Sequence, residues 1–538
     1  MAQSWPVAGG KLPGMRLVTC LCCALLGLQL PAQTSPKQPL IIHAKLAPEF
    51  SGVVSGRLLV FIGPGADGKE VDTNPFQATL ALLAGQPSQV YVAAKEVQGW
   101  APGTIIDIDV NDMVFPKPLV DASPGDYQLQ AVLDVAHRYN YAGRSAEDPL
   151  SDVVTLKDWV PVKGIPQTIT LLQQTPVRAK ESPPVEHKEA IHELSFPSPA
   201  LVNFWGREIL MRGCVLTPPS YQTKAKQRYP TVYYTHGFGG GLMYFGPVAA
   251  DLYKRMEKQQ MPEMIWVLLD ESSATGTHEF ADSVNNGPWG TALTTELIPY
   301  LERIYRMDGK ARGRFLQGHS SGGWATLWLQ TRYPKTFGGT WSTSPDPSDF
   351  HDFTGVDLYA THANIYHRPD GSPYPLVRDK GKVIGTMEQF VKLEQVLGDY
   401  GGQFASSEWV FSPRGPDGRP VQMFNRATGD VDPSVVAYWK DHYDIANLVQ
   451  RQWKTVGPQL RGKIHLIVGA ADTFYLDGAA HKLQAVLDSL NADAKFTFLP
   501  DRTHFNVYKV GDDRYGLLDE IAKEMYAVAR PNAGTNKR

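Results

Sequence analysis

A serine flanked by glycines stands in the segment RFLQGHSSGGWATL, residues 314–327. Its centre, Gly318–Gly322, reads G-x-S-x-G between a short apolar run and a helical pattern. This context is typical of a nucleophile elbow, a sharp strand-turn-helix connection that lifts a serine hydroxyl clear of a sheet. A turn that merely needs small residues is the alternative. The flanking elements favour Ser320 as a nucleophile, and we expect no room for a Cβ atom at Gly318 or Gly322.

The two neighbours of Ser320 receive no role in proton transfer. Ser321 is expected to contribute its backbone N–H group rather than its hydroxyl. The side chain of His319 is expected to point away from the nucleophile, so we assign it no catalysis.

A second glycine-rich stretch, YPTVYYTHGFGGG, ends a predicted strand in His236-Gly237. Acyl transfer needs backbone N–H groups aimed at the oxygen that becomes negative, and one such donor is worth about 3–4 kcal/mol of transition-state stabilisation. Phe238, or alternatively Gly239, could supply one donor of this oxyanion hole and Ser321 the other. We expect His236 to orient the loop; a flexible loop without a role is the alternative.

A serine hydroxyl needs a base to become a good nucleophile. In a fold with a nucleophile elbow the order along the chain is serine, acid, histidine. His504, in FLPDRTHFNVY after the last predicted strand, is therefore the candidate base. His465 lies inside a predicted strand and His481 inside a predicted helix, which makes both poorer candidates. The other histidines that follow Ser320 are His351, His362, His367 and His442.

Three carboxylates could orient the base. Asp472, in GAADTFYLDG, stands at the end of the strand KIHLIVG, where a buried carboxylate would fix the histidine tautomer and stabilise the imidazolium. Asp477 is the second candidate, although it resembles the N-cap of the next helix. Asp346, in SPDPSDF after an earlier strand, is the third.

Apolar runs alternate with amphipathic segments from Ile191 onward, which is typical of a parallel sheet covered by helices on both faces. Ligands of such sheets bind beyond the carboxyl ends of the strands, where the candidate residues stand. We predict an α/β domain over residues 191–530 with a mostly parallel sheet. Its strands are TVYYTH, MIWVLLD, RFLQGH, FGGTWSTS, KIHLIVGA and KFTFLPD, and two of its helices are ALTTELIPYLERIYR and GAAHKLQAVLDSLNA.

Residues 38–176 contain short segments that are rich in β-branched and aromatic residues and are separated by Gly, Pro, Asp and Asn. This pattern predicts an N-terminal β-sandwich. Nothing in it resembles a catalytic constellation, so a packing or binding module is favoured. A linker at 177–190, rich in proline and charge, separates the two domains. The predicted strands are GRLLVFIG, FQATLALLA, SQVYVAAKE, TIIDIDV, YQLQAVLDV and QTITLLQQ.

The N-terminal segment predicts export. Met15-Arg16 precedes the apolar stretch LVTCLCCALLGLQLPA, which is too short for a confident membrane span but fits a signal peptide over residues 1–33. A buried helix is the alternative, and Met15 could be the true start. We expect a soluble secreted or periplasmic protein without a lipid anchor. Its mature chain would keep one of the 4 cysteines, Cys214, and so no disulfide framework.

The 538 residues suit two domains, and the net charge of -3 offers no basic excess to bind nucleic acid. Beyond the predicted signal peptide, no apolar run is long enough to cross a bilayer. The sequence leaves the oligomeric state open.

Seven stretches, in this order, resemble the esterase branch of the α/β-hydrolase superfamily. That branch holds esterase D, enterobactin esterase, feruloyl esterases, S-formylglutathione hydrolase and mycobacterial mycolyltransferases. The resemblance spans about residues 200–510 and implies an α/β-hydrolase fold. It also implies Ser320 as nucleophile, Asp472 as acid, His504 as base and an oxyanion hole near Phe238 and Ser321. The stretches are VLTPPSY, YPTVYYTHGFGG, NNGPWGTALTTELIPYLERIYR, GHSSGGWATLWLQTRYP, SPDPSDF, VGAADTFYLDGA and the late THF.

The chain departs from this pattern in one place. Residues 348–453 are long for a plain member and could form a cap over the cleft. A β-sandwich before the hydrolase domain also occurs in relatives that act on siderophores or plant cell-wall esters, but this analogy of architecture identifies no ligand.

The sequence therefore predicts a serine esterase that works through an acyl-enzyme without metal or organic cofactor. Its substrate would be a small-molecule or carbohydrate-linked ester. Trp289, Trp324 and Phe474 could stack on a sugar or an aromatic acyl group. The alternatives are an acyltransferase on the same fold and a non-catalytic protein that binds a carbohydrate or a partner; a peptidase is less favoured.

Overall fold

The computed structural model describes residues 39–69, 71, 90–164, 168–172, 186–398 and 400–531. The described residues belong to one compact unit that begins at Pro39. The predicted signal peptide lies outside the described residues, as do most of the predicted linker and the predicted strand FQATLALLA.

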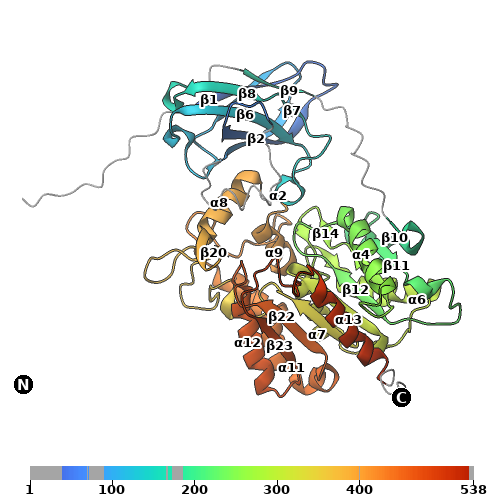
Figure 1. Ribbon diagram of the computed structural model, residues 1–538. Coiled ribbons are helices and arrows are strands. Elements are labelled where there is room, and N and C mark those ends of the chain that lie inside the picture. The colour runs from blue at the N-terminus through green and yellow to red at the C-terminus, as the bar shows by residue number, and fades with distance from the viewer. Residues whose placement is uncertain are drawn as a thin grey trace, which may run out of the picture. The chain divides into compact units, whose positions relative to one another are not determined.

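The N-terminal region is built from strands, as its sequence predicts (Figure 1). The strands form one hydrogen-bonded network in the order β4-β1-β9-β7-β6-β2-β3-β5, with β8 paired to β6. The predicted division into the two sheets of a sandwich is therefore not confirmed. Helix α2 (Tyr139–Ala142) lies between β6 and β7. The strands are β1 (Ile41–Leu46), β2 (Val54–Pro64), β3 (Tyr91–Trp100), β4 (Ile105–Asp109), β5 (Val114–Phe115), β6 (Gly125–Asp134), β7 (Leu150–Ser151), β8 (Val154–Trp159) and β9 (Thr168–Leu172).

Both faces of the central strands β2, β3 and β6 are buried. Alternate residues of a strand point to opposite faces. On β2, Leu58 and Val60 belong to a core inside the N-terminal region. Leu59 and Phe61 belong to a second core that they share with Val391 of helix α8 (Met387–Leu397). The N-terminal region is therefore packed onto α8 by apolar side chains.

The second sheet has eight strands in the order β10-β11-β13-β12-β18-β19-β22-β23. All six predicted strands are confirmed, and they run parallel to one another. Strands β10 and β11 add antiparallel pairs at one edge, so the sheet is mixed rather than mostly parallel as predicted. The strands are β10 (Ile191–Pro197), β11 (Leu210–Leu216), β12 (Thr231–Thr235), β13 (Ile265–Leu269), β18 (Arg314–His319), β19 (Gly339–Thr343), β22 (Ile464–Gly469) and β23 (Lys495–Leu499).

Helices cover both faces of this sheet. Helices α4 (Phe245–Glu257) and α13 (Gly516–Ala529) share a core with one set of strand residues. Helices on the opposite face share cores with the alternate residues. They are α3 (Pro199–Trp205), α5 (Trp289–Ala292), α6 (Ile298–Ile304), α7 (Ser321–Arg332), α11 (Ile445–Leu460) and α12 (Leu476–Ser489). A π-helical turn, Leu293–Leu297, joins α5 to α6.

The segment from 348 to 453 packs its aromatic side chains against Trp324 and Trp328 of α7 in one core. It contains α8, α9 (Gln403–Phe411), α10 (Pro433–His442) and the hairpin β20 (Pro375–Asp379)–β21 (Lys382–Thr386). Two smaller hairpins follow β13: β14 (Ser272–Ser273) with β15 (Gly276–Thr277), and β16 (Asp282–Ser283) with β17 (Gly287–Pro288). Among the helices of the described ranges, none is long and apolar enough to span a membrane.

Candidate active site

Ser320 stands at the junction between β18, which ends at His319, and α7, which begins at Ser321. Its backbone has φ 60° and ψ −125°, a conformation that side-chain-bearing residues rarely adopt. Such strain persists only where the surrounding structure enforces it, and it is often found at functional sites. Ser320 therefore has the strained geometry of a nucleophile elbow.

The glycines of the elbow are required by close backbone contacts. A Cβ atom at Gly318 would lie 2.2 Å from the carbonyl oxygen of Gly322. A Cβ atom at Gly322 would lie 2.2 Å from the carbonyl oxygen of His236. The expectation that neither position has room for a side chain is confirmed.

His504 and Asp472 meet although they follow different strands. His504 Nδ1 lies 2.9 Å from Asp472 Oδ2, and both side chains are buried. The other carboxylate oxygen of Asp472 accepts hydrogen bonds from the backbone N–H groups of Phe474 and Leu476. Burial alone would raise the pKa of Asp472, but the charge of His504 and these hydrogen bonds hold it below its usual value. Asp472 is therefore an ionised acceptor for Nδ1–H, which leaves Nε2 of His504 free to accept a proton.

Aromatic rings hold the imidazole of His504 in place. Its ring centroid lies 4.4 Å from that of His319 and 5.0 Å from that of Phe474. The side chain of His319 therefore packs against the candidate base. That it points away from the nucleophile stays a prediction. Burial and the neighbouring His504 lower the pKa of His319 to about 3, so it is a neutral packing partner.

Asp346 lies beside the candidate nucleophile rather than beside the base. The Ser320 hydroxyl donates a hydrogen bond to Asp346 Oδ1 at 3.3 Å. Burial raises the pKa of Asp346 to about 6, with His504 and the bond from Ser320 acting against the rise. Ser320 and His504 line the same cleft, but the hydroxyl is not hydrogen-bonded to the imidazole.

The loop after β12 passes directly over the elbow. A Cβ atom at Gly237 would lie 3.0 Å from the Cβ atom of Ser320. The His236 ring holds this loop: Nδ1 donates to the Gly237 carbonyl at 2.7 Å, and Nε2 lies 3.0 Å from Asp270 Oδ1. Although burial opposes it, the bond to Asp270 and the charge of Glu271 raise the pKa of His236. The backbone that carries Phe238 is thereby held close to the nucleophile.

A buried glutamate, Glu271, supports the start of α7, although no pattern in the sequence indicates this role. Glu271 accepts hydrogen bonds from the hydroxyls of Ser321 and Thr235, both at 2.9 Å. Its side chain is fully buried, and this burial raises its pKa to about 7. The Ser321 hydroxyl is thus engaged with Glu271, away from the reaction.

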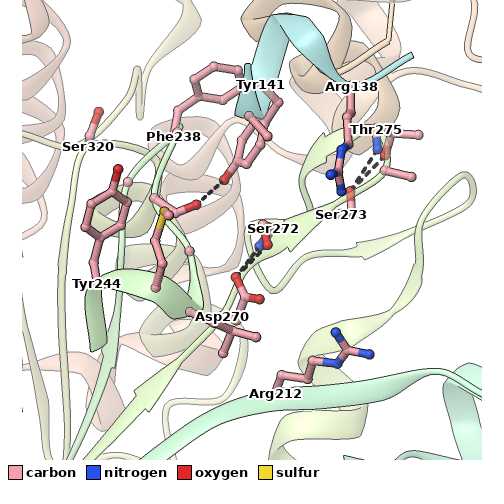
Figure 2. Close-up of a pocket in the computed structure, with 18 of the residues that line it drawn as sticks. Arg138, Tyr141, Arg212, Phe238, Tyr244, Asp270, Ser272, Ser273, Thr275 and Ser320 are labelled. Atoms are coloured by element: carbon pink, nitrogen blue, oxygen red, sulfur yellow. Dashed lines mark hydrogen bonds between the residues drawn. The ribbon is translucent and has the colours of Figure 1, made fainter. Parts of the chain in front are cut away.

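A cleft of about 1410 Å³ opens at Ser320 (Figure 2). Its wall includes the loop from Gly237 to Gly241, the rings of Phe474 and Trp289, and Tyr141 of α2. Four arginine residues also line it: Arg138, Arg207, Arg212 and Arg514. A smaller apolar pocket lies on another side of Ser320 and is lined by Trp324, Phe350, Phe353, Phe404, Phe411 and Phe474.

The three aromatic residues proposed as substrate contacts differ in position. Trp289 is almost buried, and its ring stacks on His278 with 3.6 Å between centroids. Trp324 is fully buried in the α7 core and reaches only the smaller pocket. Phe474 lines both pockets.

The remaining titratable candidates lie outside the cleft. Asp477 pairs with Arg378 at 2.8 Å within the first turn of α12, and Tyr475 is the N-cap of that helix. His465 stacks on Trp341 inside the sheet. Within the described part of the chain, no group of three or more His, Cys, Asp and Glu side chains is arranged to hold a metal ion.

A serine on a strand-turn-helix elbow, at the carboxyl ends of a helix-covered sheet, defines the α/β-hydrolase class. The sequence model of the Esterase family, described as "Putative esterase", matches residues 208–515, which is more than half of the chain. The chain belongs to this family and is a serine hydrolase of carboxylic esters.

Solved structures to which the chain is similar include ferulic acid esterases and an S-formylglutathione hydrolase. A ferulic acid esterase is 14% identical over 63% of this chain and 98% of its own, with a TM-score of 0.40. The S-formylglutathione hydrolase from Agrobacterium tumefaciens is 14% identical over 63% of this chain and 94% of its own, with a TM-score of 0.37. A ferulic acid esterase from the fungus Anaeromyces mucronatus is 14% identical over 64% and 91%, with a TM-score of 0.34. Among curated protein sequences, none matches the chain.

Proposed function

We propose that Ser320, His504 and Asp472 are the catalytic triad through which this protein hydrolyses its ester. The observation that carries the proposal is the buried contact between His504 Nδ1 and Asp472 Oδ2 at 2.9 Å, beside the cleft that Ser320 lines. Asp472 keeps the proton on Nδ1, so Nε2 can receive a proton from a serine hydroxyl. Asp346 cannot replace Asp472 in this role because it bonds to Ser320 itself.

The reaction begins when the Ser320 hydroxyl turns from Asp346 to Nε2 of His504. Nε2 takes the hydroxyl proton while Ser320 Oγ forms a bond to the ester carbonyl carbon. The negative oxygen of the tetrahedral intermediate accepts hydrogen bonds from the N–H groups of Phe238 and Ser321. When the intermediate collapses, the ester C–O bond breaks and the alcohol leaves with the proton from Nε2. Water, deprotonated by Nε2 of His504, then attacks the carbonyl carbon of the acyl-enzyme. The bond between that carbon and Ser320 Oγ breaks, Oγ takes the proton back from Nε2, and the acid is released.

The two cavities at Ser320 support separate places for the two halves of the substrate. The small pocket is lined mainly by aromatic and aliphatic residues, with Asp346 and Gln403 among its polar lining residues, and suits a small apolar acyl group. The cleft is larger and partly polar, so it suits the alcohol half, whether a small molecule or a carbohydrate. An acyltransferase would differ only in admitting a second alcohol in place of water. Secretion remains a prediction from the sequence.

Ester hydrolysis by the Ser320→Ala variant tests this proposal. We expect the wild-type chain to release acid from acetyl or feruloyl esters and Ser320→Ala to lose at least a thousandfold in kcat. Ser342→Ala is a matched control: its hydroxyl is also buried, donates to the Gly323 carbonyl at 2.8 Å and lies on the neighbouring strand. This control should keep its kcat. Full activity of Ser320→Ala would contradict the proposal, and an ester product formed with an added alcohol would favour acyl transfer.

A further inference from the structure

One wall of the cleft comes from the N-terminal region, in which the sequence shows no catalytic constellation. Helix α2 places Tyr141 at the cleft, and Arg138 just before it also lines the wall. Figure 2 shows the Tyr141 side chain lying against the loop that carries Phe238, with Ser320 beyond that loop. A region more than 170 residues before the elbow thus lies next to the proposed oxyanion hole.

Tyr141 makes two contacts with the loop at 237–241. Its hydroxyl donates to the Gly240 carbonyl at 2.9 Å. Its ring meets the Phe238 ring edge to face, with 4.9 Å between centroids and 81° between planes. Burial raises the pKa of Tyr141 far above its usual value, with Glu271 and Asp270 adding to the rise. The phenol therefore remains a donor throughout the working range of pH.

These contacts complement the support that His236 gives the loop from inside. His236 binds the Gly237 carbonyl, whereas Tyr141 binds the Gly240 carbonyl from the opposite end of the turn. A Cβ atom at Gly240 would lie 2.4 Å from His236 Nδ1, so the turn is already pressed against the ring. Phe238 lies between these two attachments, and its N–H direction depends on both.

Helix α2 is itself anchored to the esterase region. Asn140, the neighbour of Tyr141, donates to the carbonyls of Glu394 and Gly398 at 3.0 and 2.7 Å. Arg57 of β2 donates to the carbonyls of Val396 and Gln395 at 2.8 and 2.6 Å. The last carbonyls of a helix lack intrahelical partners, and a cation is favourable there. The N-terminal region therefore caps the end of α8 beside α2.

We propose that Tyr141 is a positioning residue for ester hydrolysis: it holds the loop at 237–241 so that the Phe238 N–H faces the developing oxyanion. The N-terminal region is in this way a part of the active site rather than a separate module. This inference rests on the function proposed above, because it assigns the oxyanion hole to that loop. Among the described residues, Tyr141 makes no hydrogen bond or ring contact with Ser320 or His504, so its effect must pass through the loop.

Two substitutions of Tyr141 separate the contribution of its hydroxyl from that of its ring. Tyr141→Phe removes the bond to Gly240 and keeps the ring on Phe238. A net hydrogen bond of about 0.5–1.5 kcal/mol corresponds to a two- to thirteenfold effect, so we expect kcat to fall by about that factor with KM unchanged. Tyr141→Ala should cost more because the ring contact is also lost. Tyr127→Phe is the matched control: its hydroxyl donates to the Ser123 carbonyl at 2.9 Å in the same region, outside the cleft lining.

Two further readouts distinguish positioning from loss of structure. The affinity of a trifluoromethyl ketone, which binds as a tetrahedral oxyanion, should fall with Tyr141→Phe by the same factor as kcat/KM. The pH dependence of kcat/KM should stay unchanged, because His504 is untouched. An effect confined to KM, an equal loss in Tyr127→Phe or an unchanged kcat in Tyr141→Phe would overturn the inference alone. A wild-type chain without esterase activity, or an active Ser320→Ala, would overturn the proposed function and this inference with it.

Discussion

His504 and Asp472 form a buried hydrogen-bonded pair with 2.9 Å between Nδ1 and Oδ2, across 32 residues of sequence. The pair forms because β22 and β23 are parallel neighbours, so the loops after both strands emerge at the same edge of the sheet. The carboxylate is held by two backbone N–H groups and cannot turn away. The orientation of the base is therefore fixed before any substrate binds.

Replacement of this carboxylate tests its role in fixing the tautomer. In Asp472→Asn, the amide can donate to Nδ1 and so move the histidine proton to Nε2, where a lone pair is needed. We expect kcat to fall by about a thousandfold or more at pH 7–8 with little change in KM. Asp477→Asn, five residues on and paired with Arg378, should lose less than threefold. Equal losses in the two variants, measured by ester hydrolysis, would contradict the assignment.

Substitution of Gly322, two residues after Ser320, tests the geometry of the elbow. Gly322→Ala would place a Cβ atom 2.2 Å from the His236 carbonyl oxygen, so the backbone of one segment must move. We expect a loss of about 3 kcal/mol in the free energy of unfolding, measured by urea denaturation, and loss of esterase activity. Gly52→Ala is the control, because no atom lies within 4 Å of its added Cβ. A Gly322→Ala chain as stable and active as wild type would exclude the tight elbow.

The sequence contains strong local signals for the esterase sheet and for the elbow. Continuous apolar runs predicted all six parallel strands. The order of serine, acid and histidine along the chain selected Asp472 and His504, whose side chains are in contact in the structure, while their catalytic roles stay a prediction. These features follow from hydrophobic patterning and from the order of residues along the chain, which a sequence displays directly. The antiparallel strands β10 and β11 and the single network of N-terminal strands were not predicted, because pairing depends on which strands meet in space.

Contacts between segments that are distant in the sequence leave no comparable pattern in the sequence. Tyr141 lies in a β-rich region, and only the packing of that region on α8 brings it to Phe238. Asp346 was considered as a partner of the base, whereas the structure places it against Ser320. Glu271 was missed because a single glutamate after a strand does not reveal that it will be fully buried. The contact between the rings of His319 and His504 was missed for the same reason.

The buried Glu271 predicts a pH dependence of stability. Its pKa rises from 4.5 to about 7 on folding, so the folded chain binds one more proton between these values. Stability should therefore fall as pH rises from 4.5 through 7, by on the order of 3 kcal/mol for this group. Glu271→Gln, which does not ionise, should be the more stable chain at pH 8 and nearly equal to wild type at pH 4.5. Thermal unfolding across this range is the measurement, and parallel curves for the two chains would contradict the prediction.

The anchor of the N-terminal region predicts a coupling between stability and activity. Arg57→Ala removes two hydrogen bonds from the end of α8, and we expect a loss of about 2 kcal/mol in unfolding free energy. Because α2 is held beside the same helix end, kcat should fall as in Tyr141→Phe. Arg451→Ala removes an exposed ion pair with Asp441 and should cost less than about 0.5 kcal/mol. An Arg57→Ala chain with lower stability but unchanged kcat would separate the anchor from the active site.

The central claim is that Ser320 is activated as a nucleophile by His504. Mass spectrometry of the chain after reaction with a fluorophosphonate tests it most directly, since the reagent leaves a stable phosphonyl group on the serine that attacks. We expect one adduct, mapped to the peptide with Ser320, absent in Ser320→Ala and formed at least a hundredfold more slowly in His504→Ala. An unlabelled but folded wild-type chain, or an adduct on another residue, would contradict it.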